Sequence, residues 1–265
     1  MGGEKPSDIP VVILCGGEGT RLREETEFKP KPMVTVGGKP IIWHIMKGYS
    51  KFGFKRFILC LGYKGESIKE YFLHSDLMSN DLTLRMGRRQ EDQIHRLGPE
   101  DDWTITFADT GLKSQTGARI KRIQKYVDTD RFMVAYGDGV SDINISTLAD
   151  FHAKSGRIGV LTGVRPPSRF GLMDLDGDKV IRFREKPKID EYVNAGYYVF
   201  KKEMFDWIKD DESCMIEREP LGRLASEGQL GIYKYEGFWH MMDTYKDYLD
   251  LNRMWDSGHV PWRIW

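Results

Sequence analysis

The sequence predicts an α/β protein with a mixed, mainly parallel sheet that is flanked by helices on both faces. Two observations predict it. Between residues 11 and 164, short apolar runs of strand length alternate with segments whose apolar residues have helical spacing. After residue 164 the alternation changes to short strands punctuated by Pro and Gly. We therefore expect a Rossmann-like sheet followed by a smaller, hairpin-rich part.

The expected elements alternate along the chain. Strands are expected where apolar and β-branched residues run together, at residues 11–15, 56–61, 104–108, 132–136 and 158–164. Helices are expected where apolar residues recur every three or four positions, at residues 41–52, 67–72, 120–127 and 145–155. Beyond these we expect two hairpin strands that build one wall of a pocket, then a strand and an aromatic-rich helix, at residues 171–175, 180–185, 230–235 and 244–255.

Length and charge indicate one domain that binds a small ligand. The 265 residues suffice for a single large α/β domain with its own core. Lys plus Arg and Asp plus Glu both number 40, so the formal net charge is zero. Because no overall field attracts nucleic acid or an anionic membrane, we expect neither as a partner.

The cysteines and the N-terminal segment indicate a cytoplasmic protein. Cys15, Cys60 and Cys214 are odd in number and widely spaced, which argues against a disulfide framework or a zinc site. Residues 1–10 lack the apolar core of a signal peptide, and no apolar run approaches the length of a membrane span. We therefore expect reduced thiols and a location in the cytoplasm.

A glycine-rich loop follows the first expected strand, in the segment LCGGEGTRLREETEFKPKPMVTVGGKP at residues 14–40. Gly16, Gly17 and Gly19 leave room for backbone N–H groups to approach phosphate oxygens. Arg21 and Lys31 add full charges that suit a triphosphate and a leaving pyrophosphate. Prolines on both sides of Lys31 stiffen the segment and hold this lysine extended. A solvated basic loop would explain the charges but not this rigidity.

Two better-known phosphate-binding motifs do not match this loop. A dinucleotide fingerprint that begins at Gly17 would need a third glycine where Leu22 stands. A P-loop would need Ser or Thr after Gly38 and Lys39, but Pro40 follows. The loop therefore indicates phosphate binding of another kind.

A carboxylate stands at the end of a further expected strand. The apolar run 132–136 leads into Gly137, Asp138 and Gly139, which places Asp138 where open α/β sheets bind ligands. Mg²⁺ commonly takes only one or two protein carboxylates and completes its shell with water and phosphate oxygens. Taken alone, Asp138 is explained better as a turn residue. Together with the glycine loop, the metal interpretation is favoured.

These motifs resemble those of the sugar-1-phosphate nucleotidyltransferases. The loop GG-x-GTRL followed by KPKPM resembles the signature of that family. Other segments resemble more narrowly the glucose-1-phosphate cytidylyltransferases rather than the uridylyl or thymidylyl enzymes: WHIMKGYSKFGFKRFILCLGYKG, DTGLKSQTGARIKR, YGDGVSD, RFG, REKP, NAGYYVF, EREPL and MDTYKDYLDLNRMW. The resemblance covers nearly the whole chain.

The resemblance implies an activity and an organisation. It implies Mg²⁺-dependent transfer of a cytidylyl group from CTP to α-D-glucose 1-phosphate, giving CDP-glucose and pyrophosphate. It also implies one nucleotidyltransferase domain over residues 1–265, with a nucleotide-binding part at about 9–164 and a sugar-binding and C-terminal part at about 165–265. A homo-oligomer, a trimer or a hexamer, is expected. Another nucleotide, another hexose 1-phosphate and a non-catalytic sugar-nucleotide sensor stay open as alternatives.

The resemblance also implies roles for individual residues. The nucleotide-binding set is Leu14, Cys15, Gly16, Gly17, Glu18, Gly19, Thr20, Arg21, Lys31, Ser114, Arg119 and Gly137. The sugar-phosphate set is Gly171, Glu185, Lys186 and Asn194, and the metal carboxylates are Asp138 and Asp243. Catalytic roles fall to Arg21, Lys31, Asp138 and Lys186.

Two of these positions keep a structural alternative. Asp243 precedes the expected last helix and could equally be its N-cap. Arg119 could simply start a helix after a surface loop. In addition, His240 and Met241 stand where the family has a Gln-Pro pair, beside the second metal carboxylate.

Overall fold

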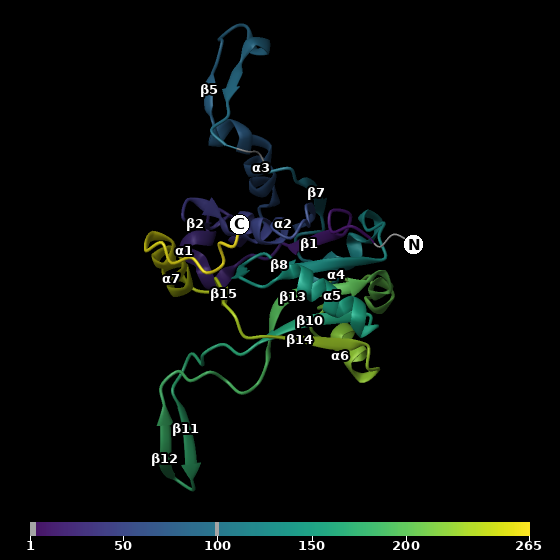
Figure 1. Ribbon diagram of the computed structural model, residues 1–265, viewed down its shortest axis with the longest axis vertical. Coiled ribbons are helices and arrows are strands. Elements are labelled where there is room, and N and C mark those ends of the chain that lie inside the picture. Colours follow the sequence, from purple (N-terminus) through teal and green to yellow (C-terminus); the bar gives the residue numbers. More distant parts are fainter. Residues whose placement is uncertain (1–3, 99–100) are drawn as a thin grey trace.

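The computed structural model describes residues 4–98 and 101–265 (Figure 1). Its core is a seven-stranded sheet with the strand order β14-β10-β13-β8-β1-β4-β7. These strands are β1 (Pro10–Leu14), β4 (Arg56–Leu61), β7 (Thr104–Asp109), β8 (Arg131–Tyr136), β10 (Gly159–Val164), β13 (Val193–Lys201) and β14 (Leu230–Tyr235). Neighbouring strands are parallel except where β13 pairs with β8 and β10. The expected fold class is confirmed.

The central strands are buried on both faces, which explains their continuous apolar runs. Val11 and Ile13 of β1 pack into the core on one face of the sheet, and Val12 packs into the core on the other. In β8, Phe132 and Val134 lie in the same core as Val12. Successive side chains of a strand point to opposite faces, so one apolar run serves both cores.

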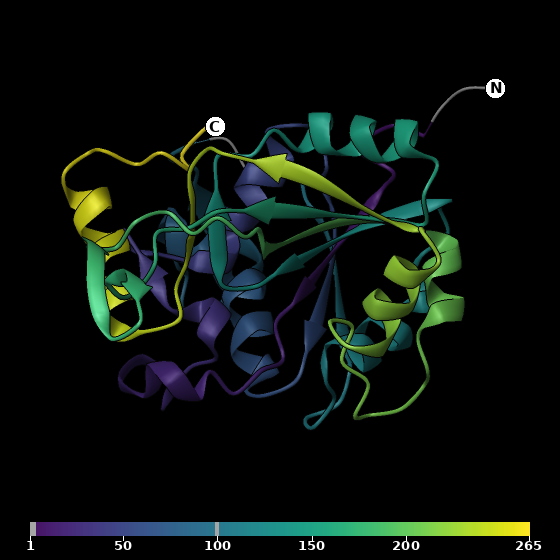
Figure 2. The same cartoon turned by 90° about the horizontal axis from the view of Figure 1, so that it is seen from below.

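Helices cover both faces of the sheet. One core includes residues of α2 (Ile41–Ser50), α3 (Gly65–Ser79), α5 (Ile145–Ser155) and α7 (Tyr245–Asp256). The other includes residues of α4 (Thr116–Arg122) and α6 (Glu219–Ser226). Figure 2 shows α5 and α6 on opposite sides of the sheet. None of the helices in the described ranges combines the length and apolar character needed to cross a membrane.

Short elements complete the body. They are α1 (Arg23–Thr26), the 3₁₀ turns Thr20–Leu22, Lys31–Met33, Gln124–Tyr126 and Lys202–Trp207, and the strands β2 (Thr35–Val36), β3 (Lys39–Pro40), β9 (Gly139–Ser141) and β15 (Trp239–Met241). β2 pairs with β3, and β9 pairs with β15.

Two parts of the sheet region differ from the expected elements. The helix expected at 120–127 is α4, which ends at Arg122 and is followed by a 3₁₀ turn. Its first turn packs closely against the segment around Cys214, since a Cβ on Gly117 would lie only 2.8 Å from Sγ of Cys214. The strand β13 was not expected. Asn194 and Gly196, which are typical turn residues, hide its apolar run.

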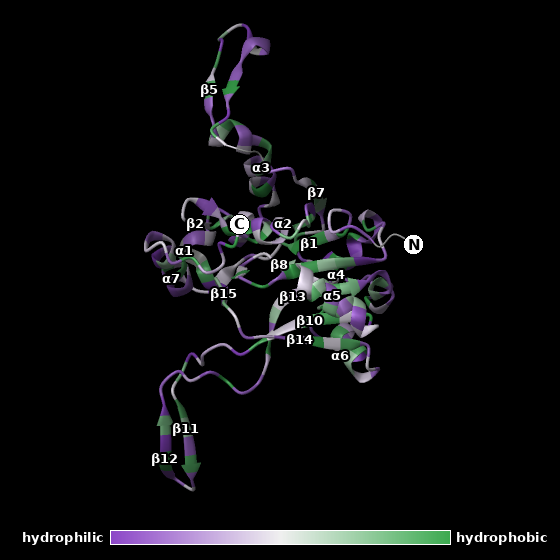
Figure 3. Cartoon of the chain, viewed as in Figure 1, coloured by the Kyte–Doolittle hydropathy of each residue, from purple (hydrophilic) through white to green (hydrophobic). Residues whose placement is uncertain are grey.

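Two hairpins extend from the body in different directions (Figure 1). One is formed by β5 (Asp81–Thr83) and β6 (Gln93–His95), and the other by β11 (Leu172–Asp176) and β12 (Lys179–Arg184). A further 3₁₀ turn, Arg89–Glu91, lies between β5 and β6. Apolar and polar residues mix along both (Figure 3). The second hairpin was expected to build a pocket wall, but it projects away from the body. Its exposed apolar side chains are Phe170, Met173, Leu175, Val180, Ile181 and Phe183.

Candidate active site

A cavity of about 390 Å³ opens at the carboxyl ends of β1 and β8. The expected ligand position of an open α/β sheet is therefore where the cavity lies. Most of the predicted nucleotide-binding residues line it. They are Leu14, Cys15, Gly16, Gly17, Gly19, Thr20, Arg21, Lys31, Ser114, Arg119 and Gly137. Both predicted metal carboxylates, Asp138 and Asp243, also line it.

Glu18 is the one member of the predicted nucleotide set that lies outside this lining. It borders an adjoining hollow together with Thr20, Thr26, Glu27 and Tyr63. Thr26 fixes this side of the loop, because its hydroxyl donates to the carbonyl oxygen of Gly19 at 3.0 Å or to that of Leu22 at 2.9 Å. The loop therefore divides the two hollows.

A pair of short strands brings the two carboxylates together. Asp138 lies between β8 and β9, and Asp243 follows β15. Pairing of β9 with β15 sets Gly139 opposite Met241, and the N–H of Met242 donates to the carbonyl oxygen of Asp138 at 2.8 Å. The relative position of the two side chains thus follows from backbone pairing between distant parts of the chain.

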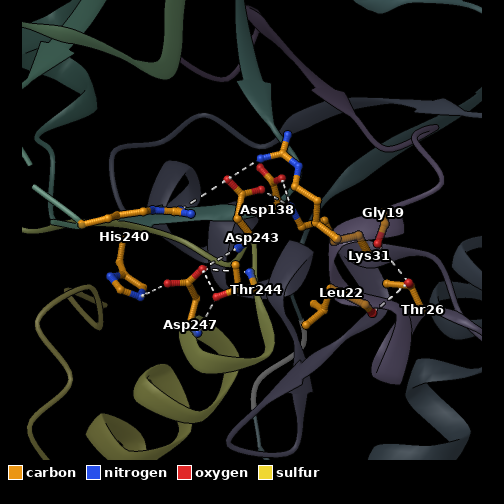
Figure 4. A network of polar contacts seen from close by, with 11 residues as sticks. Gly19, Leu22, Thr26, Lys31, Asp138, His240, Asp243, Thr244 and Asp247 are labelled. Atoms are coloured by element: carbon orange, nitrogen blue, oxygen red, sulfur yellow. Dashed lines mark hydrogen bonds and ion pairs between the residues drawn. The ribbon is translucent and has the colours of Figure 1, made fainter.

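Lys31 joins the two carboxylates (Figure 4). Its Nζ lies 2.6 Å from Oδ2 of Asp138 and 2.6 Å from Oδ1 of Asp243, while Arg21 Nη1 lies 3.4 Å from Oδ2 of Asp243. Burial would lower the pKa of Lys31, but the two carboxylates outweigh it and raise that pKa. Lys31 is therefore protonated and holds two like charges close together.

The two carboxylates respond differently to this environment. Burial raises the pKa of Asp138 in spite of the nearby Lys31. Burial acts in the same direction on Asp243, but its hydrogen bond from Lys31 and the charges of Lys31, Arg21 and Arg169 hold the pKa of Asp243 below its usual value. Asp243 is thus the more stably ionised of the two.

Asp243 does not cap the last helix. The N-cap of α7 is Thr244, whose hydroxyl accepts from the N–H of Asp247. In return, Oδ2 of Asp247 accepts from the backbone N–H groups of Thr244 at 2.8 Å and Asp243 at 3.1 Å (Figure 4). The capping box therefore anchors the backbone of Asp243 and leaves its carboxylate directed at Lys31. Asp243 was expected either to bind metal or to cap the helix, and the capping role belongs to Thr244.

His240, the departure noted beside Asp243, faces the capping box rather than the carboxylate pair. Its Nε2 lies 3.7 Å from Oδ1 of Asp247 (Figure 4). Burial lowers the pKa of His240, although Asp247 acts against this shift.

The carboxylate pair fits a hard divalent cation. Asp138 lines the cavity, and its Oδ1 is buried without a hydrogen-bond partner among the described residues, so this carboxylate retains an unused acceptor. Over residues 4–98 and 101–265, no group of three or more His, Cys, Asp and Glu forms a ready metal cage. Two carboxylates match a cation such as Mg²⁺, which keeps waters and substrate phosphates among its ligands.

Arg119 lies beneath the glycine loop with its guanidinium taken up by protein oxygens. Its side chain donates to the carbonyl oxygens of Gly16 at 3.0 Å, Leu61 at 3.0 Å and Gly111 at 2.9 Å, and to the hydroxyl of Thr110 at 2.8 Å. The residue is only 4% exposed, and burial lowers the pKa of the guanidinium. Arg119 thereby connects the loops that follow β1, β4 and β7.

The glycine at position 16 has a second reason to be small. A Cβ on Gly16 would overlap the guanidinium of Arg119, so the absent side chain makes room for this arginine as well as for a ligand. Ser114 is likewise engaged by the protein, because its Oγ accepts from Nη1 of Arg122 at 2.6 Å. Arg122 had not been assigned a role from the sequence.

The predicted sugar-phosphate residues occupy two places outside the cavity lining. Asn194 lies in β13 behind Tyr136, to whose hydroxyl oxygen its Nδ2 donates at 3.2 Å. Glu185 and Lys186 are exposed at the end of β12, with Nζ of Lys186 3.5 Å from Oε1 of Glu185. Gly171 lies beside them, since a Cβ there would lie 3.2 Å from Oε2 of Glu185. Three of the four residues thus gather on the arm that carries β11 and β12.

Comparison with known proteins assigns the family. A profile described as Nucleotidyl transferase matches residues 10–255. The chain belongs to the nucleotidyl transferase family. The glucose-1-phosphate cytidylyltransferase of Salmonella typhi is 46% identical over 259 residues, which cover 97% of this chain and 100% of that protein. The probable glucose-1-phosphate cytidylyltransferase of Bacillus subtilis (strain 168) is 42% identical over 257 residues, with 97% and 100% covered.

Solved structures show the same fold at lower identity. HddC from Yersinia pseudotuberculosis superposes with a TM-score of 0.69 at 23% identity, covering 93% of this chain and 99% of that one. A putative glucose-1-phosphate thymidylyltransferase from Bacillus anthracis gives a TM-score of 0.65 at 20% identity, covering 93% and 94%. The resemblance that the sequence motifs indicated is therefore confirmed at the level of family and fold.

This nucleotidyltransferase also has a polar wall that was not predicted. Glu217 lines the cavity and accepts from the hydroxyls of Tyr136 and Thr116, the latter at 2.6 Å. Tyr136 contacts Asn194 on its other side, so the wall links the cavity to β13. The only signal in the sequence was that Glu217 begins the motif EREPL, to which no role had been attached.

Proposed function

We propose that the chain transfers a cytidylyl group from CTP to α-D-glucose 1-phosphate, releasing pyrophosphate and giving CDP-glucose. Full-length similarity to cytidylyltransferases supports the substrates. The observation that carries the chemistry is Lys31, which joins Asp138 and Asp243 at the mouth of the glycine loop. A cation and a carboxylate pair at a phosphate-binding loop suit transfer of a nucleotidyl group rather than hydrolysis by a nucleophilic side chain.

The reaction needs positioning and charge stabilisation more than acid–base chemistry. A phosphate oxygen of the sugar 1-phosphate attacks the α-phosphorus of CTP in line with the leaving pyrophosphate. That oxygen already carries negative charge, so no side chain has to remove a proton from it. Backbone N–H groups of residues 16–20, together with Arg21 and Lys31, would bind the triphosphate and offset the charge that builds up on pyrophosphate.

Mg²⁺ is the proposed cofactor, held by Asp138 and Asp243. When bound, it supplies positive charge to the phosphate oxygens of the nucleotide. The unpartnered Oδ1 of Asp138 and the anchored backbone of Asp243 support this assignment. Lys31, which contacts the same two carboxylates, would supply a further positive charge to a phosphate oxygen at this place.

The nucleotide part at about 9–164 and the sugar part at about 165–265 are proposed to share one domain. β13 and β14 of the second part lie in the same sheet as the strands of the first, which supports this. We propose that Lys186 contacts the sugar phosphate and that Glu185 contacts the sugar hydroxyls. Gly171 leaves space beside Glu185, and Asn194 contacts the sugar next to Tyr136.

A cytoplasmic homo-oligomer is the proposed state. The three cysteines are free thiols, which supports a reducing compartment. Exposed apolar side chains along β11 and β12 support an interface with a second copy, because such a surface is costly to leave in water. Sedimentation should give three or six times the chain mass, and a monomer at micromolar concentration would contradict the proposal.

The experiment that tests the activity is pyrophosphate release by the purified protein with Mg²⁺ and glucose 1-phosphate. CTP, UTP, dTTP, ATP and GTP are compared side by side, and mannose 1-phosphate and galactose 1-phosphate serve as alternative acceptors. We expect release with CTP and glucose 1-phosphate that stops when the metal is chelated. Stronger release with another nucleotide would correct the base, and no release with any combination would refute the catalytic assignment.

A further inference from the structure

The arm that carries β11 and β12 leaves the body through a narrow two-stranded stem. The N–H of Ser168 donates to the carbonyl oxygen of Pro187 at 2.7 Å, and the N–H of Ile189 donates to that of Pro166 at 3.2 Å. An antiparallel bridge joins Pro167 to Lys188. These contacts fix the register of the stem. Arg169 and Lys186 each come one residue beyond the Ser168–Pro187 contact, one on each strand of the stem.

Arg169 reaches from this stem to the carboxylate pair. Its Nη2 lies 3.9 Å from Oδ2 of Asp243, the oxygen that Arg21 also approaches. The Arg169 side chain is 62% exposed, and this ion pair is its only polar contact with the part of the chain that the structure describes. A guanidinium has five N–H donors, so most of the donors of Arg169 remain available to a ligand.

A second arginine, Arg165 at the base of the arm, has its guanidinium engaged by other side chains of the protein. Arg165 donates through Nε to Oε1 of Glu236 at 3.1 Å, and its Nη2 lies 2.9 Å from the same oxygen. Its guanidinium also lies over the ring of Tyr192 at 5.2 Å. Arg165 therefore fixes the arm to β14, whereas Arg169 is left at the mouth of the site.

The charges around the carboxylate pair point to an anion as the missing partner. Two carboxylates are faced by three cations, Lys31, Arg21 and Arg169, before any metal is added. A divalent cation held by the same carboxylates would compete for their charge and release the arginines. Arg21 comes from the nucleotide loop, but Arg169 comes from the arm that also carries Lys186. The anion for Arg169 is therefore one that approaches from the side of the arm.

We propose that Arg169 binds the phosphate of the incoming sugar 1-phosphate together with Lys186 and presents it to the nucleotide. This proposal rests on the proposed function of the site. The planar fork of a guanidinium binds two phosphate oxygens at once and so fixes their orientation, which a lysine alone does not do. The ion pair with Asp243 keeps the guanidinium of Arg169 at the site before the sugar 1-phosphate binds.

The test compares Arg169→Gln with Arg165→Gln and the unchanged protein. We expect Arg169→Gln to raise KM for glucose 1-phosphate about tenfold or more while KM for CTP changes little, because a charge-assisted contact with one substrate is lost. Arg169→Lys should recover part of the loss. The matched change Arg165→Gln, which alters the same arm without touching the site, should leave both constants nearly unchanged.

Direct binding separates this proposal from the activity itself. Calorimetry with inorganic phosphate or glucose 1-phosphate needs no turnover, and weaker binding to Arg169→Gln than to Arg165→Gln supports the phosphate contact even if CTP is not the nucleotide. Equal binding by the two variants, or a KM for CTP that rises as much as that for glucose 1-phosphate, would overturn the role of Arg169. Failure of the unchanged protein to turn over any sugar phosphate would count against the proposed function alone.

Discussion

Replacing Lys31 by Met tests the account of the carboxylate pair most directly. Each of the oxygens that Lys31 contacts lies 2.6 Å from the same nitrogen, so the two oxygens are at most about 5 Å apart. Without the ammonium, two such charges repel by about 3 kcal/mol at an effective dielectric constant of about 20. The side chains of Lys31, Asp138 and Asp243 are 12%, 20% and 19% exposed, so solvent screens this repulsion only in part.

The expected result is a folded protein that is less stable and more responsive to metal. Urea unfolding at neutral pH should give a lower free energy of unfolding for Lys31→Met than for the unchanged protein, by up to about 3 kcal/mol. Protonation of Asp138, whose pKa burial already raises, reduces this loss. Addition of Mg²⁺ without nucleotide should restore much of this loss, since a divalent cation replaces the missing charge. The unchanged protein should gain less, because its lysine already occupies the space between the carboxylates.

Lys29→Met is the matched control for this measurement. Lys29 lies two residues away in the same proline-stiffened segment, but its ion pair is with Glu25 and not with the site. Its unfolding should be close to that of the unchanged protein, with no added response to Mg²⁺. If Lys31→Met unfolds like Lys29→Met with and without metal, the electrostatic account of the pair is wrong.

Two further predictions concern the metal carboxylate and a buried histidine. Asp138→Asn should lower turnover by orders of magnitude with folding intact, and near-normal turnover of the purified variant would refute the metal role. Burial lowers the pKa of His44 from 6.5 to about 4, so the unfolded chain binds its proton more readily and stability falls as pH drops from 6.5 toward 4. Between pH 8 and pH 5 this should cost about 2 kcal/mol in urea unfolding. In His44→Gln, whose amide can replace the ring nitrogens that contact Val36 and Trp262, the free energy of unfolding should fall less between pH 8 and pH 5. An equal fall in this variant and in the unchanged protein would exclude His44 as the cause.

Much of the sheet was predictable because its strands carry continuous apolar runs, and the central ones are buried on both faces. The ranges expected for β4, β14 and α5 agree with the structure, and that for β8 differs by one residue at its start. In each of these the local apolar pattern and the packing of the strand or helix agree. β13 escaped prediction because its pairing depends on β8 and β10 and not on its own pattern, which Asn194 and Gly196 interrupt.

The candidate site was predictable where a backbone feature places a charged residue. Strand ends and the glycine loop placed Asp138, Arg21 and Lys31 near a common cavity, and the structure does bring them together. Contacts that depend on the fine geometry of several loops were not predictable. The sequence could not show that the donors of Arg119 are taken up by backbone carbonyls, nor that Glu217 would come to face Tyr136.

The buried position of Arg119 has a consequence for exchanging the loop that carries Ser114, one of the predicted nucleotide-binding residues. This side chain binds the carbonyl oxygens of Gly16, Leu61 and Gly111, so the loop at 110–116 cannot be exchanged as a module without disturbing the glycine loop. A graft from a related enzyme would have to carry its own partner for position 119 and keep small residues at Gly16 and Gly62, where a Cβ would come too close to the guanidinium. Changes to this loop should therefore be made in coordinated sets of substitutions, and single-loop chimaeras should lose stability because the contacts of Arg119 are broken.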